Sequence, residues 1–438
     1  MGWQEEYKKR LVPPEAAVSV VRPGDRVVIP LGSNPQLLGD HLAARVNSLR
    51  DVEIAHTAVG VPFPWLGHGF EEAFSVVHEH WASPLAWEGA RSRRHDYLPT
   101  PMSLRFKGAD EGRSREEARP PDVVVLQVSP PDEDGNLNLG PHVWNTQEYI
   151  RHARAVVAEM SRQVPRCSGE TAVPLSAFTH LVEYDGPPLL WRPVRVDASI
   201  RAVADLILPL IPDGATLQIG AGSTTYAVAS CLPLAQRADL GWHSEATPSP
   251  IIGLIREGVV NGKRKTLHTG KAVSCGYIGT PQDLEFLEGN PQVEVRSCRA
   301  VVDPRVVASH DNFVAINAAI LIDLTGQAAC ESVGPVMMGG TGGLLEIITG
   351  ALWSRGGRSI LVLPSTDSGG KRSRIVPLLP EGTVVTVPRL LADTVVTEYG
   401  VARLWGKSLR QRAEELIAIA HPDFRAHLRR EARRLFYP

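Results

Sequence analysis

One glutamate and one glycine turn carry the clearest chemical signal in this sequence. The apolar run 215–219 predicts a buried strand that ends at the glycine turn 220–222, and the following residues predict the start of a helix. A strand that ends in this way presents backbone N–H groups to negative charge. Glu245 follows a second short strand, predicted at 240–244. We therefore expect Glu245 to be the reactive group and the glycine turn to stabilise the charge that develops near it.

A glutamate at the end of a strand is more often a surface residue or an ion-pair partner than a catalytic group. Other features of the sequence favour a catalytic role for Glu245, because further glycine runs occur at 339–343, before a predicted helix, and at 369–370, before basic residues. Ligands of open α/β sheets collect at the carboxyl ends of strands. Several glycine turns and one carboxylate thus predict a shared cleft. A desolvated carboxylate attacks activated acyl groups when hydrogen-bond donors meet the oxyanion that forms.

Other common site types lack their motifs. The turn 220–222 is not followed by a third glycine at the dinucleotide spacing, so a nicotinamide enzyme is a weak alternative. Neither GxxxxGK[ST] nor GxSxG occurs, which disfavours a P-loop ATPase and an α/β-hydrolase. The five cysteines show no CxxC and no Cys/His spacing, so we expect buried thiols, no disulfide framework and no metal site.

Composition limits the partners. Lys and Arg total 46 against 48 for Asp and Glu, a formal net charge of -2, which gives no electrostatic case for nucleic acid or an anionic membrane. No apolar stretch reaches the roughly 20 residues that span a bilayer. The N-terminal residues 1–10 are polar, with no apolar segment typical of a secretory signal behind them. We expect a cytoplasmic protein that acts on a small molecule.

Strands alternate with helices along most of the chain, which is typical of parallel α/β sheets. A run rich in proline and glycine at 185–193 interrupts this pattern. We place the domain boundary there, with an N-terminal α/β domain at 1–188 and a C-terminal α/β domain at 189–438 that carries Glu245. Strands are predicted at 26–30, 52–56, 122–128, 156–160, 215–219, 240–244, 272–276, 299–301, 314–316, 360–363 and 383–386.

Several longer strings resemble the acetyl-CoA hydrolase/transferase family, class I CoA-transferases that include 4-hydroxybutyrate and acetate-type enzymes. The resemblance covers most of the chain. Its strings are HSE (243–245), TLHTGKAV (266–273), DPRVVA (303–308), NAAILIDLTGQ (317–327), GGTGG (339–343), RSRIVP (372–377), TEYGVARL (397–404), GKSLRQRAEELIAIAHPDFR (406–425) and, in the first domain, VVVLQVSPPDEDGNLNLG (123–140).

The resemblance implies two tandem open α/β domains of the CoA-transferase type with the active site in the cleft between them, a homodimer, and no cofactor besides the coenzyme A thioester substrate. It also implies a ping-pong mechanism in which Glu245 attacks an acyl-CoA and becomes a glutamyl-CoA thioester. The oxyanion and CoA-binding residues that it implies are Gly220, Ala221, Gly222, Ser223, Thr224, Gly339, Gly340, Gly342 and Gly343, and the substrate pocket contains Asn34, Gln218, Tyr226 and Ala246.

The residues beside Glu245 depart from the family pattern. Where relatives have a Met-Ile-Ser-Asp-Gly type segment, this chain has 246–250, Ala-Thr-Pro-Ser-Pro, and Tyr226 also differs from the usual residue. We therefore expect an acyl or acceptor substrate other than acetate or 4-hydroxybutyrate. Two alternatives stay open: a thioester hydrolase that uses the same glutamate, and a repurposed acyltransferase or non-catalytic acyl-CoA binder. His243 shares a strand face with Glu245 and has either a tuning or a packing role.

Overall fold

The computed structural model describes residues 2–57, 62–79 and 84–436 of the chain. These residues form two compact units. Unit 1 comprises Met1–Trp191 and Val273–Val301, and unit 2 comprises Arg192–Ala272 and Val302–Pro438. Each unit is built on a largely parallel sheet with helices, so the predicted α/β fold class is confirmed.

Unit 1 first ends at Trp191, close to the predicted boundary at 188, but one later segment of the chain also belongs to unit 1. Residues 273–301 lie in unit 1, although the sequence places them in the C-terminal domain. Backbone hydrogen bonds attach this segment: Val143 donates to the Cys275 carbonyl, and Glu170 donates to the Val295 carbonyl. Its elements are β12 (Ala272–Ile278), α11 (Pro281–Leu287), β13 (Val293–Val295) and α12 (Cys298–Val301).

The sheet of unit 1 is parallel throughout, in the order β4-β3-β2-β1-β5-β7-β9. Its interior strand β5 has the sequence Val-Val-Val-Leu-Gln-Val and is buried at every position, as expected for a strand covered on both faces. The strands are β1 (Arg26–Ile29), β2 (Val52–His56), β3 (Phe74–His78), β4 (His95–Tyr97), β5 (Val123–Val128), β7 (Ala155–Met160) and β9 (His180–Glu183), with a separate antiparallel pair of β6 (Asn136–Asn138) and β8 (Ala172–Pro174).

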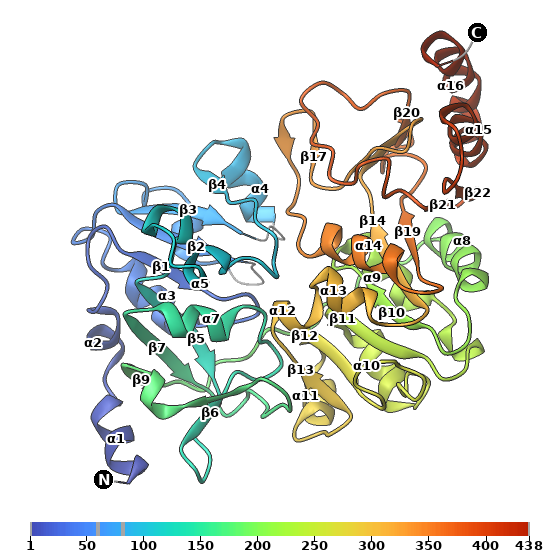
Figure 1. Cartoon of the computed structure of the whole chain (residues 1–438). Coiled ribbons are helices and arrows are strands. Elements are labelled where there is room, and N and C mark those ends of the chain that lie inside the picture. Colours follow the sequence, from blue (N-terminus) through green and yellow to red (C-terminus); the bar gives the residue numbers. More distant parts are fainter. Residues whose placement is uncertain (1, 58–61, 80–83, 437–438) are drawn as a thin grey trace. The chain divides into compact units, whose positions relative to one another are not determined.

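Helices cover this sheet. Helix α2 contacts α3 and β9, and α3 contacts β7 (Figure 1). Apolar side chains from these elements and from β1, β2 and β5 form one buried cluster. The helices of unit 1 before residue 191 are α1 (Trp3–Arg10), α2 (Pro14–Val18), α3 (Gln36–Ala43), α4 (Pro84–Arg91), α5 (Lys107–Asp110), α6 (Arg115–Ala118) and α7 (Thr146–His152).

The strands of unit 2 follow the order β11-β10-β14-β19-β21-β22. All these pairings are parallel except that of the edge strand β22 with β21. A small sheet of β16, β15 and β20 and a hairpin of β17 and β18 complete the unit. The strands are β10 (Thr216–Ile219), β11 (Gly241–Pro248), β14 (Phe313–Ala318), β15 (Leu321–Asp323), β16 (Ala328–Ala329), β17 (Ser332–Val333), β18 (Val336–Met337), β19 (Arg358–Val362), β20 (Ile375–Val376), β21 (Thr394–Thr397) and β22 (Gly400–Arg403).

Helices of unit 2 contact the same strands that hold the predicted site. Helix α9 contacts β10 and β14, α14 contacts β14 and β19, and α15 contacts β22 and α16 (Figure 1). Buried side chains from α14, β19, β21 and α15 form the core. The helices are α8 (Ala198–Ile207), α9 (Ser223–Cys231), α10 (Ser249–Arg256), α13 (Pro304–Ala308), α14 (Leu344–Trp353), α15 (Leu409–Ile419) and α16 (Pro422–Leu435).

Three strand predictions need correction. The segment 299–301 is part of the helical turn α12, in which Ala300 and Val301 donate backbone hydrogen bonds to Ser297. The segment 383–386 is not a strand, because its backbone groups form isolated hydrogen bonds with side chains and turns. For example, the Val384 N–H donates to the Ser332 hydroxyl. The strand predicted at 240–244 continues to Pro248, so Glu245 lies inside a strand rather than after it.

All five cysteines are free thiols. Three of them, Cys167, Cys275 and Cys298, are buried as predicted, whereas Cys231 and Cys330 are only partly buried. Across the ranges that the structure describes, no helix combines the length and the apolar character that crossing a bilayer requires.

Candidate active site

Glu245 is the one residue of β11 that is not fully buried. The pairing of β10 with β11 matches Leu217 with Trp242. Counting three residues onward brings Glu245 level with position 220, where β10 has just ended. The Ser244 hydroxyl also donates to the Ile219 carbonyl over 3.3 Å and ties the two strands together there. The Glu245 carboxylate therefore lies at the carboxyl edge of the sheet, where α/β proteins bind ligands.

The glycine-rich loop 339–343 meets this carboxylate. The Gly343 N–H donates to Glu245 Oε2 over 2.7 Å, across 98 residues of sequence. Gly343 is the N-cap of α14, so the carboxylate lies at a helix N-terminus. Unpaired N–H groups and the helix dipole both stabilise negative charge at this position.

Burial, however, acts more strongly on Glu245 than this donor does. Desolvation raises the pKa of Glu245 to about 7, the Gly343 N–H opposes the rise, and the negative charge of Glu346 in the first turn of α14 adds to it. A carboxylate with a raised pKa is more basic, and hence more nucleophilic, than an exposed one. The surroundings of Glu245 therefore suit a nucleophile.

The loop needs glycine because it approaches the carboxylate so closely. A Cβ on Gly342 would lie 2.8 Å from Glu245 Oε1, and Gly342 has a left-handed φ of +51°. A Cβ on Gly343 would lie 2.9 Å from Oε2 and 3.0 Å from Val302 Cγ1. Backbone atoms rather than side chains thus surround the reactive group on this side.

The second predicted glycine element also takes the expected form. Helix α9 begins at Ser223 directly after β10 and the turn, and Gly222, at φ +152°, is its N-cap without a side-chain cap. Ala221 and Ser223 are exposed, and Gly220, Gly222 and Thr224 are partly exposed. The first N–H groups of α9 have no partners within the helix. The turn therefore presents donors at the edge of the sheet where Glu245 lies.

The predicted pocket residues have different surroundings. Burial and, to a lesser extent, the negative charge of Glu245 raise the pKa of the Tyr226 phenol, which places Tyr226 within the electrostatic influence of Glu245. Ala246 is buried and, as the next residue on β11, points to the opposite face from Glu245. Asn34 belongs to unit 1 and donates to the Pro187 carbonyl over 3.0 Å.

Gln218, the fourth predicted pocket residue, is buried and bonds to Asn317, a residue to which the sequence assigned no role. Asn317 opens one of the strings that carry the family resemblance, which was the only signal available for it. Val302 beside the glycine loop was likewise not predicted. A neutral amide or an aliphatic side chain carries no chemical signature in a sequence.

The other residues singled out from the sequence have structural partners. The buried His243 ring lies 4.5 Å from that of His310, which agrees with a packing role. Arg374 donates to the Thr366 carbonyl over 3.0 Å, whereas Lys371 and Arg372 are exposed. These basic residues, which follow the glycines at 369–370, are also candidates for contact with CoA phosphates, and that contact stays a prediction.

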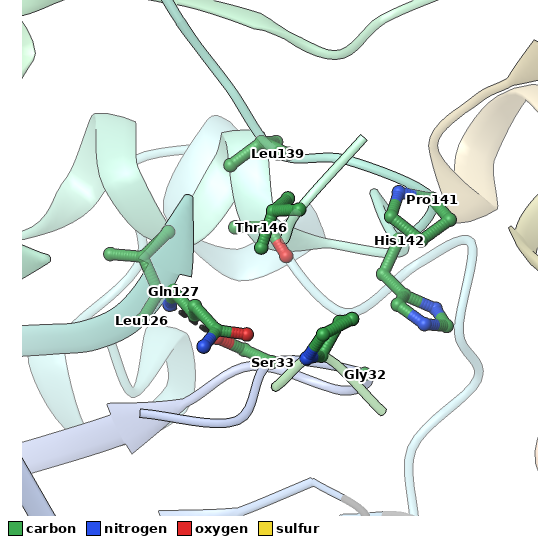
Figure 2. Close-up of a pocket in the computed structure, with 10 residues that line it drawn as sticks. Gly32, Ser33, Leu126, Gln127, Leu139, Pro141, His142 and Thr146 are labelled. Atoms are coloured by element: carbon green, nitrogen blue, oxygen red, sulfur yellow. Dashed lines mark hydrogen bonds between the residues drawn. The ribbon is translucent and has the colours of Figure 1, made fainter. Parts of the chain in front are cut away.

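Unit 1 contains a small cavity at the carboxyl ends of β1 and β5. These adjacent strands are the point from which the sheet order runs in opposite directions, a usual place for ligands. The cavity measures about 20 Å³, which suits one water-sized group. Figure 2 shows Gly32, His142 and Thr146 around it, and the Gln127 N–H that donates to Ser33 Oγ over 2.7 Å. Burial lowers the pKa of His142 to about 4, so its ring is neutral near pH 7.

The raised pKa of Glu245 gives a testable pH dependence. Because the carboxylate attacks and the carboxylic acid does not, we expect the single-turnover rate of thioester cleavage to reach a plateau above about pH 7 and to fall tenfold per pH unit below it. Glu346→Gln should move the midpoint to lower pH because it removes a negative neighbour. Glu346→Asp, which keeps the charge, is the control. A wild-type midpoint near 4.5 would show that burial does not act on Glu245 as described.

Comparisons with known proteins identify the family of this chain. A family model described as the acetyl-CoA hydrolase/transferase N-terminal domain matches residues 1–212, and the C-terminal domain model of the same family matches 279–432. The 4-hydroxybutyrate coenzyme A transferase of Clostridium kluyveri is 37% identical, with 100% of each chain covered. The succinyl-CoA:cyclohexane-1-carboxylate CoA transferase of Geobacter metallireducens is 34% identical over 99% of this chain and 97% of its own. Among solved structures, RipA from Yersinia pestis is similar at a TM-score of 0.91, with 29% identity and 100% of each chain covered.

Proposed function

Because this chain belongs to the acetyl-CoA hydrolase/transferase family and is a CoA-transferase, we propose that it moves CoA between an acyl-CoA and a carboxylic acid through a glutamyl-CoA thioester on Glu245. The observation that carries this proposal is the contact between the Glu245 carboxylate and the Gly343 N–H, at 2.7 Å, in an environment that raises the pKa of Glu245 to about 7.

The reaction proceeds in two attacks. In the first, a Glu245 oxygen adds to the thioester carbonyl and the C–S bond breaks, which gives a mixed anhydride and the CoA thiolate. In the second, the thiolate adds to the glutamyl carbonyl, releases the acyl group as a carboxylate and leaves CoA as a thioester on Glu245. An acceptor carboxylate then reverses both steps and leaves as the new acyl-CoA.

Each attack creates an oxyanion that needs donors. In the second attack the oxyanion forms on a carboxyl oxygen of Glu245 itself, and the Gly343 N–H already contacts Oε2. For the first attack we assign the backbone N–H groups of Ala221 and Gly222, which lie at the N-terminus of α9. The CoA would lie along the turn up to Thr224.

The proposal extends to the substrates and the setting. The altered residues Tyr226 and Ala246 favour an acyl or acceptor group other than acetate or 4-hydroxybutyrate. Coenzyme A enters as a substrate, without a further cofactor, and the resemblance supports a homodimer. The polar N-terminal residues 1–10 support a cytoplasmic location.

The test is an assay that follows free thiol when the protein is mixed with acyl-CoA, with and without carboxylate acceptors. We expect thiol to stay low and a new acyl-CoA to form only when an acceptor is present. Thiol release that needs no acceptor would instead identify a thioester hydrolase. Intact-mass measurement during turnover should detect CoA on Glu245, and its absence together with an absence of turnover over a broad panel of acids would favour a non-catalytic acyl-CoA binder.

A further inference from the structure

A reciprocal pair of amide side chains lies beneath the glycine turn of unit 2. Gln218 belongs to β10 and Asn317 to β14, and their exposed fractions are 1% and 2%. Gln218 Nε2 donates to Asn317 Oδ1 over 3.1 Å, and Asn317 Nδ2 donates to Gln218 Oε1 over 3.0 Å. Each amide both donates to and accepts from the other, which determines the orientation of both.

The pair contacts the turn at Gly220. The pairing of β10 with β14 places Ile219 opposite Ile316, and the Gly220 N–H donates to the Ile316 carbonyl over 2.9 Å. Asn317 is the next residue on β14, and its Oδ1 lies only 2.4 Å from the point where a Cβ of residue 220 would be. The Asn317 amide thus occupies the space that a side chain at 220 would fill, so the turn rests directly on the amide pair.

Glu245 lies on the other side of the same turn. The register of β10 with β11 brings Glu245 level with Gly220, as the register of β10 with β14 does for Asn317. Residues at one level of a parallel sheet point to the same face. Asn317 and Glu245 therefore flank Gly220 on one face, and the position of the turn between them depends on the amide pair.

Packing alone does not call for two amides here. Apolar side chains of similar shape can replace a satisfied buried hydrogen bond at little cost in stability. A mutual pair of hydrogen bonds instead selects one geometry. We propose that Gln218 and Asn317 are positioning residues, which hold the N–H groups of the 220–222 turn in place relative to Glu245. This inference rests on the proposed function, and it gives Gln218 a supporting role in place of the predicted contact with substrate.

A double-mutant cycle in the full chain tests the pair. Gln218→Met and Asn317→Leu remove the amides and keep approximate size, and the double variant completes the cycle. We expect each single variant to slow the single-turnover formation of the CoA adduct on Glu245 by about 10- to 100-fold. The dissociation constant for acyl-CoA, taken from the concentration dependence of the rate, should rise by a smaller factor than the rate falls, because the turn is proposed to bind CoA as well, whereas the oxyanion forms only during the attack. The double variant should be no slower than the slower single one, because the pair acts as a unit.

Hydrogen exchange in the free protein gives a readout that needs no activity. The amides of 220–224 should exchange faster in both single variants, while those of β19 and β21 should not change. Asn317→Asp, which keeps the size of the side chain, replaces Asn317→Leu if the latter does not fold. Three outcomes would each overturn the inference: rate losses of the two single variants that multiply in the double variant, a loss that lies mainly in acyl-CoA binding, or unchanged hydrogen exchange at 220–224. If the wild type forms no adduct, the proposed function fails, and the exchange result alone decides whether the pair positions the turn.

Discussion

Replacing Glu245 with alanine should abolish CoA transfer and the covalent CoA adduct together. We expect turnover to fall at least about 10⁴-fold, or about 5 kcal/mol in activation free energy, because the variant lacks the atom that attacks the thioester. The glycine elements on either side are unchanged, so acyl-CoA should still bind. The measurements are the transfer rate with acyl-CoA and a carboxylate acceptor, and the intact mass of the protein after mixing with acyl-CoA.

Glu245→Asp is the matched control for this prediction. It keeps the carboxylate but shortens the side chain by one methylene, which draws the group away from the Gly343 N–H that it contacts at 2.7 Å. We expect a smaller loss, about 10²- to 10³-fold, with a CoA adduct that still forms more slowly than in the wild type. Transfer that persists in Glu245→Ala, or an adduct on another residue, would remove Glu245 from the mechanism.

These variants also define what separates a transferase from a hydrolase. Both alternatives need the same glutamyl-CoA thioester, so both lose activity in Glu245→Ala. They differ in whether water or a carboxylate reaches the glutamyl carbon, which depends on how the site excludes water. The lifetime of the adduct in the absence of an acceptor is therefore the more informative quantity: a long-lived adduct indicates transfer, and rapid hydrolysis indicates a thioesterase.

Much of the fold follows from local sequence patterns. The strands β1 and β5 are short, nearly continuous apolar runs, and such runs are typical of strands buried on both faces. The C-terminal sequence predicts helices at 409–419 and 422–435, and α15 and α16 have these bounds. The structure agrees best with the predictions for segments whose own residues exclude other kinds of secondary structure.

Other strands depend on partners that the sequence does not reveal. The tetrapeptide Thr-Val-Val-Thr occurs twice, at 383–386 and at 394–397. Only the second copy is a strand, β21, which is buried at every position and pairs with β19 and β22. In the first copy Val384 and Val385 are exposed. Because the same four residues take both forms, the location of neighbouring strands decides the outcome, as expected of a context-dependent propensity.

The candidate site likewise combines features that the sequence reveals with features that it does not. A carboxylate and two glycine elements are visible in the sequence, because catalytic carboxylates and left-handed or closely approached backbone restrict residue type. The contact that joins Glu245 to Gly343 spans 98 residues: the glycine runs and the carboxylate predicted a shared cleft, but no local pattern specified this contact. The amide pair joins Gln218 on one strand to Asn317 on another, and the rise in the pKa of Glu245 comes mainly from burial. No local sequence pattern records either feature.

Gly343→Ala should disable the site while leaving the fold intact. Gly343 has φ -84° and ψ 10°, which alanine adopts without strain, so the cost arises only from the new methyl group. That methyl would lie 2.9 Å from Glu245 Oε2 and 3.0 Å from Val302 Cγ1. We expect the carboxylate to be pushed away from the Gly343 N–H and the rate of adduct formation to fall about 10²-fold, with a loss of about 1–2 kcal/mol in the free energy of unfolding.

Gly253→Ala is the control, since Gly253 lies within α10 with no atom within 4 Å of its Cβ position. That variant should keep full activity and gain about 0.5–1 kcal/mol in stability from better helix propensity. Adduct formation by single-turnover mass measurement and denaturant unfolding compare the two alanines directly. If Gly343→Ala formed the adduct as fast as Gly253→Ala, the close approach of the glycine loop would have no part in catalysis, and the donor for the second oxyanion would lie elsewhere.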